Sequence, residues 1–180
     1  PKEGESIYDP ACGTGGMLLG AIEHVERAGG DPRTFFGKIF GQEKNLTTSS
    51  IARMNLVLHG IEDLKIVRED TLRSPAFTDA SIGSLATFDC VIANPPFSQN
   101  YSRATLKFPH RFREWCPETG KKADLMFVQH MIASLKRDGH MATIMPHGVL
   151  FRGGKEKLIR EIFIDDDLIE AIISLPPGLF

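Results

Sequence analysis

The residues with the clearest chemical potential are Asn94-Pro95-Pro96-Phe97, which directly follow an apolar run at residues 88–93. The amino group of adenine is a poor nucleophile because its lone pair is delocalised into the ring. Two acceptors facing its N–H bonds, the Asn94 side-chain oxygen and the Pro95 carbonyl, would draw the nitrogen toward a pyramidal, nucleophilic form. The prolines hold that carbonyl rigidly, and Phe97 can stack on a base flipped out of a duplex. We therefore predict Asn94, Pro95 and Phe97 as catalytic residues.

A second group, residues 9–16, lies between a predicted strand and a predicted amphipathic helix. Its glycines permit a tight turn and let a ligand approach the backbone closely. Backbone N–H groups near a helix N-terminus also suit a polar or negative ligand group. A glycine-rich turn can equally connect a strand to a helix without any ligand, so other residues must decide. The cofactor-binding residues predicted in this loop are Asp9, Ala11, Gly13, Thr14, Gly15 and Gly16.

Two acidic residues, Glu43 and Asp70, stand at the ends of the next two predicted strands. Glu43 can accept hydrogen bonds from ribose hydroxyls, and Asp70 can accept one from an adenine amino group. A nicotinamide-binding fingerprint would need a third glycine where Leu18 stands. Asp9 would repel a pyrophosphate but suits the ammonium group of a methionine moiety. The residues therefore predict S-adenosylmethionine as the cofactor, and the chemistry requires no metal.

These residues need a scaffold, and the apolar pattern predicts one. Short apolar runs alternate with helix-period segments, which is typical of a parallel α/β sheet. Strands are predicted at residues 6–9, 38–42, 64–68, 88–93, 140–145 and 169–174. Helices are predicted at residues 15–28, 45–59, 123–137 and 155–163, the second with Ile51, Met54 and Leu58 on one apolar face. We expect an α/β fold with a doubly wound, mostly parallel sheet and ligands outside the carboxyl ends of its strands.

The composition is that of an ordinary globular domain. The 180 residues are 42% hydrophobic and 24% charged, with a formal net charge of −2, so we expect one catalytic domain over residues 1–180. No apolar run approaches the ~20 residues of a membrane span, so no membrane association is expected. The cysteines are odd in number and far apart, which argues against disulfides and a zinc site and favours the cytoplasm. They are Cys12, Cys90 and Cys116.

The weak negative charge means that any nucleic-acid surface must be local. Residues 101–122 are the best candidate because they combine basic side chains with interleaved aromatic ones. Either a DNA-contacting surface or a long solvated loop is compatible with this composition. His147 and Arg152, in a loop after the predicted strand at 140–145, receive no assigned role. The basic residues of the segment are Arg103, Lys107, Arg111, Arg113, Lys121 and Lys122.

Residues 9–16 followed by the tetrad at 94–97 resemble the amino-methyltransferases that act on adenine. Four further segments make the sequence similar to the modification (M) subunit of type I restriction-modification systems, and the resemblance runs nearly end to end. It implies a Rossmann-like S-adenosylmethionine-dependent methyltransferase fold and N6 methylation of an adenine flipped out of double-stranded DNA. It also implies a specificity subunit that reads the DNA sequence and a restriction subunit as partners. The four segments are residues 52–56, 127–131, 146–154 and 175–180.

Compared with that family, the chain lacks the helical N-terminal region and the final strand after Phe180. It also begins without a methionine, so we expect it to be a fragment of a longer protein. Three alternatives stay open. A protein glutamine methyltransferase can use the same Asn-Pro-Pro-aromatic chemistry, although it normally carries Tyr at the fourth position. A methyltransferase-like module could hold cofactor or DNA without turnover, and a nicotinamide oxidoreductase is disfavoured by Leu18 and Asp9.

Overall fold

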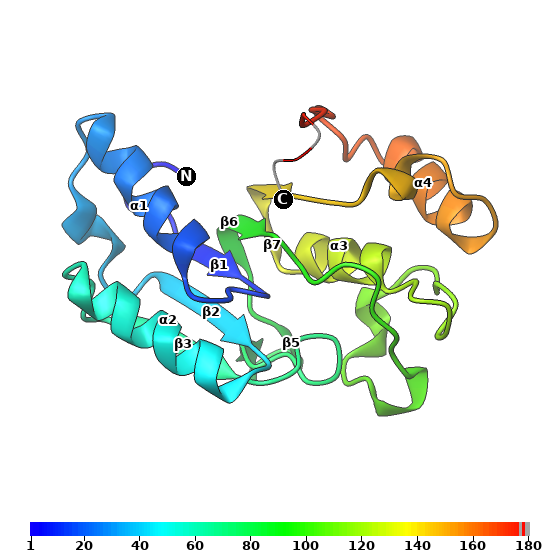
Figure 1. Ribbon diagram of the computed structural model, residues 1–180, viewed down its shortest axis with the longest axis horizontal. Helices are drawn as coiled ribbons and strands as arrows, with labels where there is room; N and C mark the ends of the chain where they lie inside the picture. The colour runs from blue at the N-terminus through cyan, green and yellow to red at the C-terminus, as the bar shows by residue number, and fades with distance from the viewer. Residues whose placement is uncertain (177, 179–180) are drawn as a thin grey trace.

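The structure is a computed structural model that describes residues 1–176 and 178. Its central strands are β1 (Ile7–Asp9), β2 (Ile39–Glu43), β3 (Leu64–Arg68), β6 (Phe88–Ala93) and β7 (Leu135–Thr143). They form a five-stranded sheet in the order β3-β2-β1-β6-β7, and every pairing is parallel. After β3 the chain returns to the middle of the sheet (Figure 1). The strand order therefore reverses between β1 and β6, which is where open α/β sheets bind ligands.

The remaining elements connect these strands. The α-helices are α1 (Gly16–Arg27), α2 (Leu46–Leu58), α3 (Asp124–Ala133) and α4 (Lys155–Asp165). Short 3-10 helices are η1 (Pro32–Phe35), η2 (Arg103–Thr105), η3 (Pro109–Arg111) and η4 (His147–Leu150). A small hairpin pairs β4 (Thr78–Asp79) with β5 (Ser84–Leu85). Among the described residues, no helix is long and apolar enough to cross a membrane.

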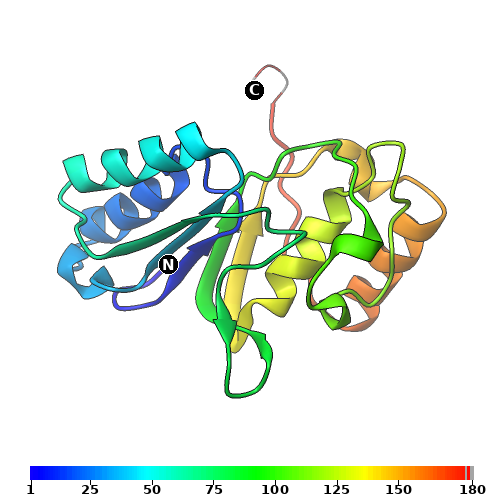
Figure 2. The same ribbon diagram turned by 90° about the horizontal axis from the view of Figure 1, so that it is seen from below.

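Hydrophobic core residues lie on both faces of the sheet. Successive strand side chains point to opposite faces, so Ile7 packs with α1 and α2 in one core while Tyr8 packs with Met131 of α3 in the other. Figure 2 shows α1 and α2 together on one side of the strands and α3 on the other. This burial on both faces explains why β6 reads as a continuous apolar run rather than an alternating one. The predicted doubly wound, parallel α/β architecture is confirmed.

The predicted apolar face of the second helix is wrong. Ile51, Met54 and Leu58 of α2 are 46%, 64% and 77% exposed, and the helix instead buries Ser49, Ala52 and Leu56. Ala52 and Leu56 pack in the core with Leu18, Ile39 and Ile66. The same face of α2 meets the loop before α1, where a Cβ at Gly15 would lie 3.5 Å from the Leu56 side chain, an ordinary contact distance.

The predicted helix over residues 123–137 is wrong at its C-terminal end. Helix α3 stops at Ala133, and β7 runs from Leu135 to Thr143 straight through Asp138-Gly139, where we expected a helix stop. The register between β6 and β7 shifts between Phe88 and Cys90. A Cβ at Gly139 would lie 2.9 Å from the Phe88 carbonyl oxygen, so the glycine serves a close backbone approach at this irregularity.

The sixth predicted strand is also wrong. Residues 169–174 have no regular structure and lie outside the sheet, with Ile172 and Ile173 61% and 81% exposed. An apolar run becomes a strand only when a neighbour satisfies its backbone groups, and these residues have no such neighbour in the described part of the chain. Positions 177, 179 and 180 of the family-like segment 175–180, and the strand expected after Phe180, lie outside the described residues.

The irregular register between β6 and β7 leads to a prediction about stability. Gly139→Ala should lower the free energy of unfolding by about 1–3 kcal/mol, because the added Cβ forces backbone atoms apart. Urea unfolding followed by circular dichroism measures the change. Gly20→Ala in α1 is the control, since a Cβ there meets nothing within 4 Å and should stabilise the helix by roughly 0.5–1 kcal/mol. Equal stability of Gly139→Ala and the parent chain would contradict this account of β7.

Candidate active site

A cavity of about 270 Å³ lies at the carboxyl ends of the central strands. Its walls come from the segments that follow β1, β2, β3 and β6, together with residues 99–106. The cavity therefore sits at the point where the strand order reverses. Of the predicted site residues, Ala11, Glu43 and Asp70 line it. The tetrad reaches it through Pro96, and further lining residues include Pro10, Lys44, Thr71, Leu72 and Arg73.

The glycine-rich loop is held in a tight turn beside this cavity. Cys12 N donates to the Gln42 carbonyl at 3.0 Å, and Gly15 N donates to the Cys12 carbonyl at 2.8 Å. Gly13 and Gly15 have φ values of 54° and 85°, a region that favours glycine. Thr14 is fixed through its carbonyl, which accepts from Asn55 Nδ2 at 3.1 Å. Contacts with the ends of β1 and β2 and with α2 thus determine the shape of the loop. Helix α1 begins at its end, at Gly16.

Glu43 is anchored against this loop. Its Oε2 accepts from Gly13 N at 3.1 Å and its Oε1 from Asn45 N at 2.8 Å. Each carboxylate oxygen keeps a further lone pair for a ligand hydroxyl. The structure therefore brings together Glu43 and the loop, which the sequence predicted to share a site.

Asp70 also lines the cavity. Its Oδ2 forms an ion pair with Lys44 Nζ at 2.8 Å, and its Oδ1 accepts from Arg73 N at 3.2 Å. The next residue, Thr71, donates its hydroxyl to the Pro10 carbonyl at 2.5 Å. This bond ties the segment after β3 to the segment after β1.

Asp9 is the most unusual ionisable group of the site. Its side chain is buried, and Oδ1 accepts from Ala11 N at 2.9 Å. Burial raises the pKa of Asp9 to about 7, the Ala11 N–H opposes the rise, and the charge of Glu43 adds to it. A carboxylate held this way gains from a nearby cation, because an opposite charge favours the ionised form.

The tetrad lies beside the loop because β1 and β6 are neighbours, with Tyr8 opposite Val91. Asn94 is exposed and Pro95 is buried, while Phe97 is 37% exposed. The amide and the aromatic ring are thus open to a substrate, and the proline between them is packed. This arrangement offers hydrogen-bond acceptors on a rigid backbone, next to a ring that can stack on a planar group.

A buried polar chain beneath the cavity was missed by sequence reasoning. Arg111 Nη1 donates to His130 Nδ1 at 2.8 Å and to the Thr71 carbonyl at 3.2 Å, and Nη2 donates to the Leu72 carbonyl. Burial and the charge of Arg111 hold the pKa of His130 well below its ordinary value, so the ring is neutral. Its Nε2 then donates to Tyr8 Oη at 3.1 Å. The chain clamps the wall formed by residues 70–73.

This clamp removes Arg111 from the candidate DNA-contacting residues of the basic segment at residues 101–122. Arg111 is 5% exposed and cannot contact DNA. Lys122 pairs with Glu156 at 3.3 Å and Arg113 pairs with Asp166. Arg103 stacks over Trp115, 4.0 Å from the ring centroid. Much of the apparent basic patch therefore serves internal contacts. In the sequence, the polar residues Asp124, Gln129 and His130 within the otherwise apolar stretch 124–133 were the signal of buried polar contacts.

The strand order and the glycine-rich loop after β1 define the class of the protein. They are the features of the class I S-adenosylmethionine-dependent methyltransferase fold. A putative methyltransferase of this class from Listeria monocytogenes matches with a TM-score of 0.66 and 22% sequence identity, over 90% of this chain and 45% of its own. The match shows that the two proteins share a fold.

The chain belongs to the N-6 DNA methylase family, whose model matches residues 1–180. It is 38% identical to the type I restriction enzyme MjaVIII methylase subunit of Methanocaldococcus jannaschii, over 100% of this chain and 31% of that subunit. The type I restriction-modification methyltransferase subunit of Streptococcus thermophilus superimposes with a TM-score of 0.77 and 35% identity, over 91% of this chain and 34% of its own. The chain thus spans about a third of the length of these relatives.

The burial of Asp9 predicts a pH-dependent stability. The folded protein binds a proton at Asp9 up to about pH 7, whereas the unfolded chain releases it near its ordinary pKa of 3.8. Between about pH 4 and 7 the unfolded chain has lost this proton while the folded protein keeps it, so the free energy of unfolding falls as the pH rises through that range. Asp9→Asn removes this penalty, so its stability relative to the parent should increase across that range.

Urea unfolding at a series of pH values measures the difference between Asp9→Asn and the parent chain. The control is Asp138→Asn, an exposed carboxylate on β7, for which the difference should stay nearly constant. A pH-independent difference for Asp9→Asn would show that its carboxyl titrates normally in the folded protein.

Proposed function

We propose that the protein is the catalytic part of an adenine-specific DNA methyltransferase, the modification subunit of a type I restriction-modification system. It transfers a methyl group from S-adenosylmethionine to the N6 amino group of adenine. The observation that carries this proposal is the meeting of Ala11, Glu43 and Asp70 with Pro96 of the tetrad around one cavity. Membership of the N-6 DNA methylase family supports the same function.

The polar groups around the cavity fit the parts of the cofactor. Glu43, fixed by two backbone N–H groups, accepts hydrogen bonds from the ribose hydroxyls. Asp70 accepts from the adenine amino group, and the buried carboxylate of Asp9 favours the ammonium of the methionine moiety. Gly13, Thr14, Gly15 and Gly16 keep the backbone close to the ligand. When bound, the cofactor supplies a methyl group on a positively charged sulfur.

The tetrad prepares the target nitrogen. The Asn94 side-chain oxygen and the Pro95 carbonyl accept the two N–H bonds of the adenine amino group, which localises its lone pair. Phe97 exposes 37% of its surface and stacks on the flipped base. The contribution of these residues is orientation and charge stabilisation, so no side chain has to form a covalent intermediate.

The partners belong to the same proposal. The relatives described above are subunits of type I restriction enzymes, and we infer that this protein likewise works with a specificity subunit and a restriction subunit in the cytoplasm. The burial of Arg111 and the ion pairs that Arg113 and Lys122 form with acidic residues support this inference, because they reduce the positive charge that this segment offers to DNA. A small number of phosphate contacts positions a protein on DNA without reading the sequence.

Cofactor binding is tested by Glu43→Ala in the full-length subunit. Losing a charged acceptor should weaken S-adenosylmethionine binding by roughly 1.5–3 kcal/mol, measured by titration calorimetry. Glu62→Ala, an exposed acid just before β3, is the control and should bind normally. Normal affinity in a folded Glu43→Ala protein would remove Glu43 from the cofactor site.

Catalysis is tested by Asn94→Ala in the complex of the full-length subunit with its specificity partner. Transfer of labelled methyl groups to adenine should fall by about 10²–10³-fold, the typical loss when one preorganised polar group is removed from a transition state. Cofactor affinity and thermal stability should stay close to those of the parent, because Asn94 is exposed. A parallel collapse of stability would instead mean that Asn94 serves the fold of the turn.

A further inference from the structure

The residue that follows the tetrad has a strained backbone. Ser98 has a φ of 57°, a left-handed conformation that is unfavourable for a non-glycine residue. Such strain persists only where surrounding contacts hold it in place. Here the contact is a hydrogen bond of 2.8 Å from Ser98 N to Asp124 Oδ1. Residues 94–98, which we call the catalytic turn, thus end on a buried carboxylate.

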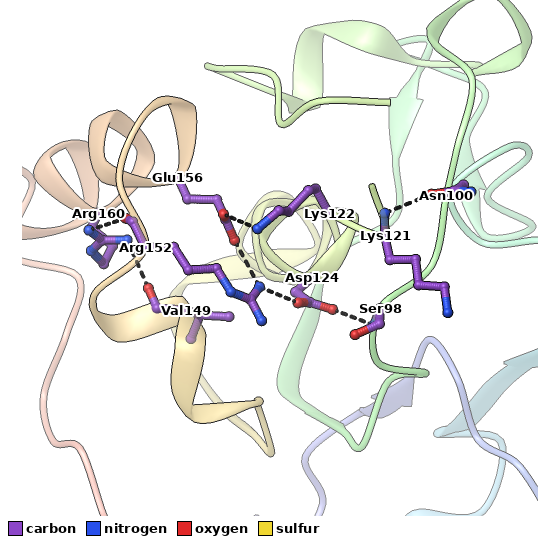
Figure 3. A network of polar contacts seen from close by, with 9 residues as sticks. All are labelled: Ser98, Asn100, Lys121, Lys122, Asp124, Val149, Arg152, Glu156 and Arg160. Carbon is purple, nitrogen blue, oxygen red and sulfur yellow. Dashed lines mark hydrogen bonds and ion pairs between the residues drawn. The ribbon is translucent and has the colours of Figure 1, made fainter. Parts of the chain in front are cut away.

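Asp124 is itself part of a charged network (Figure 3). Its side chain is buried, and its Oδ2 accepts from Arg152 Nη1 at 3.0 Å. The same Arg152 nitrogen donates to Glu156 Oε1 at 3.1 Å, and Glu156 Oε2 pairs with Lys122 Nζ at 3.3 Å. Two buried carboxylates are therefore balanced by two cations, which buried charges require. The network links the catalytic turn to α3, η4 and α4.

The guanidinium of Arg152 lies directly against Gly148. A Cβ at Gly148 would lie 2.5 Å from Arg152 Nε and 2.7 Å from Nη2, so a larger residue at this position would displace the guanidinium. The backbone around it is also fixed, since Arg160 donates to the Arg152 carbonyl at 2.7 Å and to the Val149 carbonyl at 2.9 Å. The space beside Gly148 and the hydrogen bonds from Arg160 thus both support the ion pair between Arg152 and Asp124.

A second clamp holds the segment just beyond the turn. Ala123 N donates to the Gln99 carbonyl at 3.0 Å, and Lys121 N donates to Asn100 Oδ1 at 2.8 Å. Lys121 also has a left-handed φ, of 58°. Residues 98–100 are therefore pinned to residues 121–124 at three points, of which only the Asp124 bond depends on Arg152.

We propose that Asp124, held by Arg152 and Glu156 in the space left by Gly148, is a positioning residue that sets the geometry of the catalytic turn. The inference rests on the proposed function, because the turn matters through Asn94 and Pro95. Asp124 does not touch the substrate. It fixes Ser98 N and thereby the direction in which the two acceptors of the turn point, and a displacement of about 1 Å at such a site can cost 10²-fold in rate.

The test uses the full-length subunit with its specificity partner and duplex DNA. Asp124→Ala removes the acceptor, and Gly148→Ala displaces the guanidinium without changing any charge. Both should lower kcat for methyl transfer by up to about 10²-fold, with KM for DNA and Kd for the cofactor within about twofold. Asp124→Asn keeps an oxygen for Ser98 N and should retain more activity than Asp124→Ala. The control is Glu161→Gln on α4, whose exposed pair with Lys157 lies outside the network.

Hydrogen–deuterium exchange of peptides containing Ser98 separates this inference from the proposed function. Exchange should be faster in Asp124→Ala and Gly148→Ala and unchanged in Glu161→Gln. Unchanged exchange in the first two variants overturns the positioning role, whether or not the parent transfers methyl groups. Faster exchange with an undiminished kcat overturns it as well. If the parent transfers no methyl groups to adenine, the proposed function fails, while the exchange data still decide whether Asp124 holds the turn.

Discussion

Strand β1 is three residues long, yet it pairs with β2 on one side and β6 on the other. Ile7 faces the core under α1 and α2, and Tyr8 faces the core under α3. The chain leaves this strand at Asp9, directly between the ends of its two neighbours. The glycine-rich loop, Glu43 and the tetrad can meet only because this central strand is parallel to both. A slip by one residue would exchange the two faces and separate the loop from the tetrad.

Local sequence patterns were sufficient to predict those elements whose burial is decided by their own residues. The strands at 64–68 and 88–93 match their predicted bounds. The bounds of β6 could be predicted because this strand is buried on both faces and ends at an Asn-Pro step. Leu18, Ile22 and Val25 are the buried stripe of α1, as their helical spacing indicates. The candidate site could be predicted for a related reason: parallel strands place their carboxyl ends at one edge, so residues at those ends must converge.

Features that depend on distant partners could not be predicted. The buried face of α2 is set by its packing against α1, β2 and β3, and the course of β7 by an irregular register against β6. Arg111 and Arg152 look like solvated or DNA-binding cations in the sequence. The Thr71 carbonyl that Arg111 contacts lies 40 residues away along the chain, and the Asp124 carboxylate that Arg152 contacts lies 28 residues away, so no local pattern contains these two partners. A charged residue is stable inside a protein only when such partners exist, and its sequence neighbours do not reveal them.

Helix α3 connects the two halves of the site. At its first residue, Asp124 holds the catalytic turn, and His130 on the same helix accepts the hydrogen bond of Arg111, which clamps the wall at residues 70–73. Six residues of α-helix span about 9 Å, and a buried helix is a stiff spacer because its side chains are packed on all sides. The catalytic turn and the cavity wall at residues 70–73 are thus both held by the same rigid helix. Group transfer between two bound molecules requires a fixed distance between them, and in this fold α3 is the element that can set it.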